Sequence, residues 1–147
     1  MKQKKIVIAC DHAGYELKVR LIEYLKEKQF IIEDLGTDSG ESTDYPEYGH
    51  ALAEHVASGR YDAGISLCGS GNGINITANK HPEIRSALCW RADIAELARR
   101  HNNANICALP ARFISFELAC EIVDIFIDTP FDGGRHQRRI EKIPIKC

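Results

Sequence analysis

The chain has 147 residues, of which 44% are hydrophobic and 27% charged, and its formal net charge is −2 at pH 7. This length suits a single domain that removes roughly 70% of its unfolded surface from water, so its core needs neither disulfides nor a metal. The near-neutral charge excludes a general nucleic-acid or polyanion binder, which would carry a basic excess, so any phosphate recognition must be local.

The N-terminal residues predict neither a secretion signal nor a membrane anchor. Only residues 6–10 form an apolar run before Asp11 interrupts it, whereas a membrane-spanning helix needs ~20 apolar residues. The six cysteines include no CxxC pair, which favours a reduced compartment over disulfides or zinc. We therefore expect a cytoplasmic protein that contacts no membrane.

Short apolar runs alternate along the chain with apolar residues at helical spacing. The runs predict five strands, at residues 5–10, 30–35, 63–68, 85–89 and 105–109. The helical spacing predicts helices at 15–28, 48–56, 73–79, 92–102 and 116–126, and residues 36–46 form a polar loop. Strands separated by helices pair in parallel through right-handed crossovers. The sequence therefore predicts a single-domain α/β fold, with a five-stranded parallel sheet covered by helices on both faces.

The segment Cys68-Gly69-Ser70-Gly71-Asn72-Gly73 carries the most chemical information. A strand that ends in a thiol and continues into glycine-rich backbone can bring several N–H donors close to a small anion. Ligands bind beyond the carboxyl ends of the strands in such a sheet. Asp11 and His12 follow the first strand at the same edge, so we expect the two segments to share one pocket.

Known glycine motifs do not fit this loop. Ile74 occupies the position of the third glycine of a dinucleotide fingerprint and of the arginine of a Cys-x5-Arg phosphatase loop. No P-loop is present, and a nucleophile elbow needs glycines two residues to either side of the serine, where Ser70 has Cys68 and Asn72. Cys68 is then a candidate nucleophile, ligand or general base beside a helix N-terminus. Its position alone favours a buried structural cysteine, as expected for Cys10, Cys89 and Cys107, but only Cys68 is followed by a glycine run.

Two other polar segments are candidates for ligand binding. Asp11 and His12 could bind a hydroxylated ligand or transfer a proton, and the alternative is that they cap the first helix. Arg135 and Arg139 follow two glycines and would project from one face of a helix, where they could bind a phosphate. The alternative for these arginines is a solvated basic surface.

The remaining histidines give weaker signals. His101 lies on an apolar helical stripe, so it is as typical of an ordinary half-buried histidine as of a functional one. No partner is evident for three others, which are predicted to be structural or surface residues: His50, His55 and His81.

Six segments, in order along the chain, resemble the type B ribose-5-phosphate isomerases. They are Cys10-Asp11-His12, Thr43-Asp44-Tyr45-Pro46, Cys68 to Gly73, Ala78-Asn79-Lys80, Arg100-His101-Asn102 and Gly133 to Gln137. The resemblance implies one sugar-phosphate isomerase domain over residues 1–147, with a basic C-terminal segment at 133–142. It also implies a Rossmann-like three-layer sandwich, no metal or cofactor, and a homodimer or tetramer whose active sites are shared between subunits.

By this resemblance the chain would interconvert D-ribose 5-phosphate and D-ribulose 5-phosphate through a cis-enediolate. Cys68 would be the general base, loop N–H groups and Ser70 would stabilise the oxyanion, and His101 would protonate the ring oxygen with Asp11 as its partner. In the family, His101 and Asn102 reach the pocket from the partner subunit, so a monomer would be inactive. The positions that match substrate contacts are Asp11, His12, Tyr45, Gly69, Ser70, Gly71, Asn72, Gly73, Asn102, Arg112, Arg135 and Arg139.

The chain departs from the family pattern at two loop positions. Ser70 stands where threonine is more common, and Asn72 stands where an apolar residue is more common, which predicts a small effect on rate. A six-carbon substrate, allose 6-phosphate or galactose 6-phosphate, is the nearest alternative. A sugar-phosphate binding module without catalysis is another, and a thiol redox enzyme is disfavoured because no resolving cysteine lies at short spacing.

Overall fold

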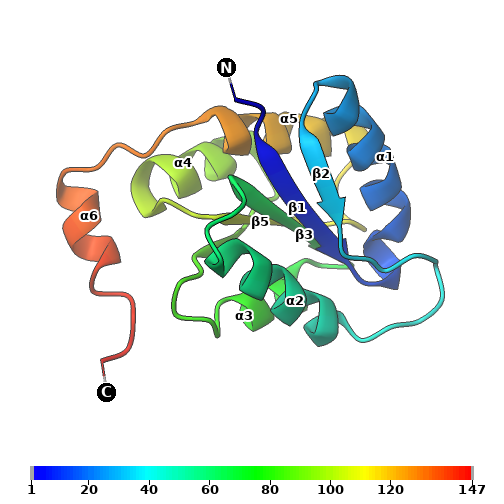
Figure 1. The fold of residues 1–147 in the computed structure, drawn as a ribbon, viewed down its shortest axis with the longest axis horizontal. Coiled ribbons are helices and arrows are strands. Elements are labelled where there is room, and N and C mark those ends of the chain that lie inside the picture. The colour runs from blue at the N-terminus through cyan, green and yellow to red at the C-terminus, as the bar shows by residue number, and fades with distance from the viewer. Residues whose placement is uncertain (1, 147) are drawn as a thin grey trace.

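The computed structural model describes residues 2–146, in which five strands alternate with helices (Figure 1). The strands are β1 (Lys5–Cys10), β2 (Ile31–Asp34), β3 (Ala63–Cys68), β4 (Ser86–Leu88) and β5 (Ile106–Pro110). The helices are η1 (His12–Gly14, a 3-10 turn), α1 (Tyr15–Glu27), α2 (Tyr45–Ala57), α3 (Asn72–Ala78), α4 (Ala92–Asn102), α5 (Phe116–Asp128) and α6 (Arg135–Ile140). The predicted strands and helices are confirmed, most with bounds that shift by one or two residues.

Two helical segments differ from the prediction. Helix α2 begins at Tyr45 rather than near residue 48, because Pro46 occupies its first turn, where a missing N–H costs no hydrogen bond. Residues 45 and 46, predicted to lie in the polar loop, are therefore helical. Helix α6 is a further short helix after α5, and it carries the basic segment.

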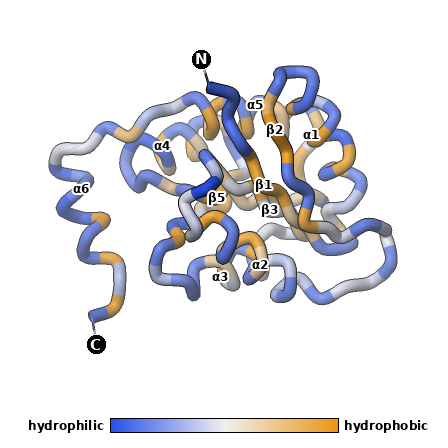
Figure 2. The backbone as a smooth tube through the Cα atoms, in the orientation of Figure 1, coloured by the Kyte–Doolittle hydropathy of each residue, from blue (hydrophilic) through white to orange (hydrophobic). Residues whose placement is uncertain are grey.

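The sheet has the strand order β2-β1-β3-β5-β4, and every neighbouring pair is parallel. Helices α1, α4 and α5 pack their apolar residues against one face, and α2 and α3 cover the other. The inner strands β1, β3 and β5 are buried on both faces, so nearly all their residues are apolar. Figure 2 shows this hydrophobic colour along β1. The predicted three-layer α/β fold is confirmed.

All five strands point the same way, so the sheet has a carboxyl edge and an amino edge, where the strands end and begin respectively. The register places Cys68 opposite Pro110, at the carboxyl edge. Helix α4 runs back from that edge, and the Arg85 Nε, just before β4, donates to the Asn102 carbonyl over 3.2 Å. The C-terminal end of α4 therefore lies at the amino edge.

The structure supports the prediction that Cys10, Cys89 and Cys107 are buried structural residues. Cys10, Cys68, Cys89, Cys107 and Cys120 are all free. Burial raises the pKa of the Cys10 thiol to about 11, and Cys10, Cys89 and Cys107 are fully buried core residues, as predicted. None of the helices described between residues 2 and 146 is long and apolar enough to cross a membrane.

Candidate active site

Cys68 is held between two neighbouring strands at the carboxyl edge, with 4% of its surface exposed. The preceding carbonyl, of Leu67, accepts a hydrogen bond from the Asp11 N–H over 3.2 Å. On the other side, the Cys68 carbonyl accepts from the Ala111 N–H over 2.9 Å. The thiol is therefore fixed in place by backbone bonds to the residues that follow β1 and β5.

The glycines after Cys68 are required by close packing. Gly71 has a φ of 77°, and a Cβ there would lie 2.5 Å from the Leu88 Cδ1. A Cβ on Gly73 would lie 2.5 Å from the Tyr45 ring. Helix α3 starts directly afterwards, and the first N–H groups of a helix have no carbonyl partner within it. The loop thus combines a thiol with a compact set of backbone donors.

The two loop residues that depart from the family pattern contact each other. The Ser70 Oγ accepts a hydrogen bond from the Asn72 N–H over 3.3 Å and from its side-chain Nδ2 over 3.2 Å. Both side chains are exposed. The hydroxyl at position 70 is therefore oriented by the amide at position 72.

Asp11 and His12 occupy the same edge but have different partners. The Asp11 Oδ1 accepts from the N–H groups of Ala13 and Gly14, at 3.0 and 3.3 Å, so Asp11 caps the 3-10 turn η1 that precedes the predicted first helix. The His12 Nδ1 accepts from the Thr43 N–H over 3.1 Å, and the His12 N–H donates to the Thr43 Oγ1 over 3.2 Å. An Nδ1 that accepts leaves the Nε2 as the proton-bearing donor of the neutral ring.

Two other predicted residues line this edge. Arg112 follows β5, and its Nη1 lies 3.1 Å from where a Cβ on Gly69 would be. Tyr45, at the start of α2, packs against Gly73. The structure therefore brings together Asp11, His12, Tyr45, Cys68, Gly69, Ser70, Gly71, Asn72, Gly73 and Arg112 along one edge of the sheet. Thr43, named only as part of a motif, joins them, and no periodic signal in the sequence marks its contact with His12.

The other predicted site residues lie at the opposite edge. His101 and Asn102 end α4, and Arg135 and Arg139 lie on α6, which packs against α4. Asn105 pairs with Arg85 beside this helix end, and β5 then runs from Ile106 to Pro110, roughly 13 Å along the strand, before it reaches the level of Cys68. Within one chain, the structure does not bring His101 close to Cys68 or Asp11.

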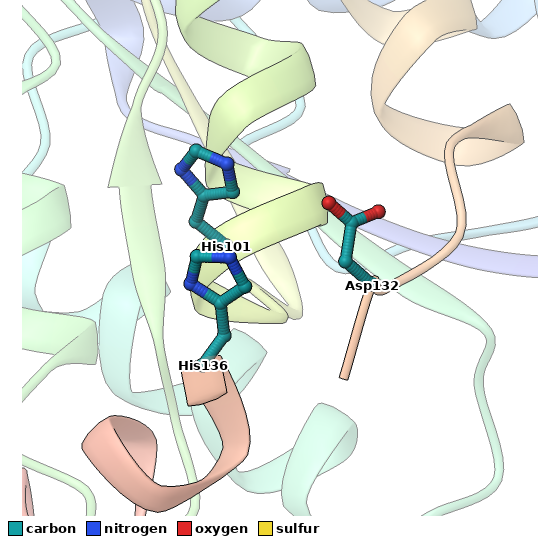
Figure 3. A group of neighbouring side chains, drawn as sticks. All are labelled: His101, Asp132 and His136. Atoms are coloured by element: carbon teal, nitrogen blue, oxygen red, sulfur yellow. The ribbon is translucent and has the colours of Figure 1, made fainter. Parts of the chain in front are cut away.

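His101 instead has two close neighbours of its own. Its ring stacks on that of His136, with the centroids 4.3 Å apart and the planes within 11° (Figure 3). One Asp132 carboxylate oxygen and one ring nitrogen from each histidine lie within 4.8 Å of one another. Burial, and then the positive charges of His101, Arg135 and Arg139, lower the pKa of His136. Sequence reasoning assigned no role to Asp132 or His136, although His136 lies within the quoted segment Gly133 to Gln137.

These three side chains are the residue types that bind transition metals, but their arrangement does not fit an ion. Imidazole lone pairs lie in the ring plane, so stacked rings do not direct them at a common point. Ligands around tetrahedral zinc lie about 3.3 Å apart, closer than the 4.8 Å limit of this group. The Asp132 carboxylate is also paired with the Arg100 Nε at 3.3 Å.

The remaining histidines have partners that the sequence did not reveal. The His50 Nδ1 lies 2.8 Å from the His81 Nε2, and the His55 Nδ1 donates to the Ala51 carbonyl over 2.7 Å. These contacts agree with the predicted structural or surface role, and they supply the partners that were not evident in the sequence. The His50–His81 pair joins α2 to the segment after α3, a contact between distant residues that no spacing reveals.

Comparison with known proteins identifies the family. The Ribose/Galactose Isomerase family model matches residues 6–143. The chain is 44% identical to ribose-5-phosphate isomerase B of Escherichia coli K12, over 95% of this chain and 94% of that protein. A crystal structure of a ribose 5-phosphate isomerase from Thermotoga maritima superimposes with a TM-score of 0.95 and 53% identity, over 97% and 99% of the two chains.

A second solved structure carries a ligand. Ribose-5-phosphate isomerase B from Mycoplasma genitalium, with bound ribulose-5-phosphate, has a TM-score of 0.91 and 42% identity, over 95% of this chain and 93% of that one. The family model, the Escherichia coli relative and both solved structures confirm the resemblance drawn from six sequence segments. The chain belongs to the Ribose/Galactose Isomerase family.

Proposed function

We propose that the chain is an aldose–ketose isomerase that interconverts D-ribose 5-phosphate and D-ribulose 5-phosphate, with Cys68 as its general base. The Escherichia coli relative is named for this reaction, and the Mycoplasma genitalium protein binds ribulose 5-phosphate. The observation that carries the assignment of the base is the thiol fixed at the end of β3, next to a loop of backbone donors. The phosphopentose is the expected substrate.

The central step moves a proton between two neighbouring carbons. The Cys68 thiolate removes the proton from C2 of the open-chain aldose, the C–H electrons form the C1–C2 double bond, and the carbonyl electrons move to O1. The N–H groups of residues 69–73 and the Ser70 hydroxyl stabilise this oxyanion, because fixed donors need no reorganisation as charge develops. Return of the proton to C1 and transfer of the O2 proton to O1 give the ketose.

The cyclic sugar must first open, and we assign this step to His101 of a second copy. His101 donates a proton to the ring oxygen as the C1–O4 bond breaks, the O1 hydroxyl passes its proton to water, and the O–H electrons form the C1–O1 double bond. The support is topological: His101 and Asn102 lie at the amino edge, so they cannot serve the Cys68 of their own chain. A homodimer that joins the amino edge of one copy to the carboxyl edge of the other completes the site, and Asp11 then faces the incoming His101.

The phosphate requires positive charge and N–H donors at the far end of the pocket. The His12 Nε2 and the exposed Arg112 guanidinium supply both at the carboxyl edge. Arg135 and Arg139, four residues apart on the short exposed helix α6, add two guanidiniums from the second copy. Tyr45 and Asn102 contact the sugar hydroxyls. The reaction moves only protons, which these side chains handle, so we assign it no metal or cofactor, and five free thiols suit a reducing compartment such as the cytoplasm.

Parallel rate measurements with ribose 5-phosphate and allose 6-phosphate test the proposed substrate. We expect kcat/KM to be higher for ribose 5-phosphate, and a higher value for allose 6-phosphate would overturn the assignment. The Cys68→Ala variant, tested in the same assay and for ligand binding, separates an enzyme from a binding module. We expect turnover to collapse while affinity for ribulose 5-phosphate persists, whereas unchanged turnover would exclude Cys68 as the base.

A further inference from the structure

The His101 ring depends on α6 for its orientation. It projects from the last turn of α4 and is only half buried. The His136 ring is stacked against it, with the centroids 4.3 Å apart and the planes nearly parallel, and Figure 3 shows the two rings as neighbours. An acid that must deliver a proton to one ring oxygen needs a defined ring plane, because a small misplacement of a catalytic group costs rate.

The chain around α6 is built to hold His136 in this position. The Asp132 N–H donates to the Arg100 carbonyl over 3.0 Å, and the Asp132 carboxylate pairs with the Arg100 Nε at 3.3 Å. Gly133 and Gly134 follow, with φ values of 70° and 58°, a conformation that other residues rarely adopt. These two glycines turn the chain so that α6 returns against α4. Asp132 thus anchors the turn to α4, and the turn places His136 next to His101.

The charges around the stack disfavour a proton on the His136 ring. His136 faces Arg135 and Arg139 on its own helix, Asp132 in the turn, and His101 on α4, while Arg100 is paired with Glu96 and Asp132. Burial and the surrounding positive charges lower the pKa of His136. The lowered pKa favours the neutral form of the His136 ring at pH 7.

We infer that His136 is a positioning residue for the ring-opening acid, that it acts by stacking on His101, and that Asp132 anchors it. The inference rests on the proposed function, because it assumes that His101 opens the sugar ring. It goes further in assigning a task to the histidine of the Gly-Gly-Arg-His segment that is separate from phosphate binding by Arg135 and Arg139.

Two readouts in one reaction separate positioning from general damage. Conversion of ribose 5-phosphate needs ring opening and proton transfer. Exchange of the C1 proton of ribulose 5-phosphate with D2O needs only the base, because the ketose is already open. We expect His136→Ala to lower turnover of ribose 5-phosphate about tenfold, the effect of losing one aromatic stack. The exchange rate should stay within about twofold of the parent, because the misplaced His101 ring takes no part in proton transfer at C1.

The matched variant is His136→Phe, which keeps a flat ring but cannot titrate. We expect it to restore turnover to within about threefold of the parent, because stacking needs no ionisable group. Asp132→Asn, which removes the ion pair but not the backbone bond, should show the same selective loss at a smaller size. Unchanged turnover in His136→Ala, an equal loss of exchange, or no recovery in His136→Phe would each overturn the inference.

A parallel His101→Ala measurement tells the two hypotheses apart. If this variant converts ribose 5-phosphate at the parental rate, the ring-opening role fails and the proposed function must be revised. If it loses conversion but keeps exchange while His136→Ala behaves like the parent, only the positioning role fails. Size-exclusion chromatography of every variant verifies that the assembly is intact.

Discussion

The carboxyl edge of the sheet is fixed by backbone packing inside one chain, whereas the amino edge presents its polar groups on a helix end and a short basic helix. At the carboxyl edge, Cys68 and Asp11 are almost fully buried and Gly71 admits no side chain. At the amino edge, His101 is half buried, and Arg135 and Arg139 are exposed. This difference fits the proposed function, in which one copy of the chain supplies a fixed base and a second copy supplies the acid.

The supports of the two edges differ as well. The Lys18 Nζ, with 1% of its side chain exposed, donates to the Asp34 Oδ1 and to the Thr37 carbonyl, each over 2.6 Å. These bonds hold the segment after β2 next to β1, at the start of the loop that leads to Thr43. The corresponding ion pair at the amino edge, between Arg100 and Asp132, lies at the surface. Buried pairs are sensitive to the loss of a partner and exposed pairs are not.

The largest effect is expected from Cys68→Ala. Loss of a general base lowers turnover by roughly 10²- to 10⁴-fold, and both ribose 5-phosphate conversion and C1 exchange should fall together. The matched control is Cys120→Ala, a buried free thiol on α5, which should keep both activities. A Cys120→Ala variant as slow as Cys68→Ala would show that the loss reflects a damaged fold.

The next effect concerns stability, and it compares the same substitution at both edges. Asp34→Asn leaves the buried Lys18 charge without a carboxylate, which should lower the free energy of unfolding by about 3 kcal/mol; we choose the low end of that range because 40% of the Asp34 side chain is exposed. Asp132→Asn removes the exposed pair and should unfold at the same urea concentration as the parent. If the two variants lose the same free energy of unfolding, the ion pairs at the two edges do not differ in their contribution to stability.

A smaller effect is expected when the phosphate contacts on α6 are neutralised. Arg139→Gln should raise KM for ribose 5-phosphate about tenfold with little change in kcat, since a hydrogen bond to a charged group contributes ~1.5 kcal/mol or more. Arg138→Gln, on the neighbouring helix position, is the control and should leave KM unchanged. If both variants raise KM equally, the arginines attract phosphate only through their general charge.

The smallest effect is expected at the loop positions that depart from the family. Ser70→Thr and Asn72→Val should each change kcat by about twofold or less, as expected for one exposed hydrogen bond. Because Asn72 donates to the Ser70 Oγ, Ser70→Ala and Asn72→Val, each of which removes the side-chain contact, should not be additive in a double-mutant cycle. Strict additivity would contradict the contact.

Sequence periodicity predicted the layers well because it records burial. The continuous apolar run of residues 5–10 and the spacing along 92–102 gave the bounds of β1 and α4 as the structure has them. The run that ends in Cys68 and its glycines also placed the thiol at the correct edge. These features depend on neighbours in the sequence, which is why patterns of apolar residues and glycines reveal them.

The features that were missed depend on contacts between distant residues. Thr43 meets His12 from 31 positions away, and His81 meets His50 over the same separation. His136 meets His101 because Gly133 and Gly134 turn the chain, and a hydrogen bond from the Asp132 N–H to the Arg100 carbonyl anchors that turn. No local spacing encodes such pairs. The motifs marked the segments, but only the fold shows which side chains touch.

The most direct test of a site shared between two copies is subunit complementation. Cys68→Ala and His101→Ala chains, each inactive alone on ribose 5-phosphate, are unfolded together and refolded as a mixture. If acid and base come from different copies, each hybrid dimer has one site with both residues intact, and random pairing should restore about a quarter of the parental activity. If both residues serve the same chain, every site lacks one of them, and the mixture stays inactive. A mixture that remains inactive although hybrid dimers have formed would contradict the shared site.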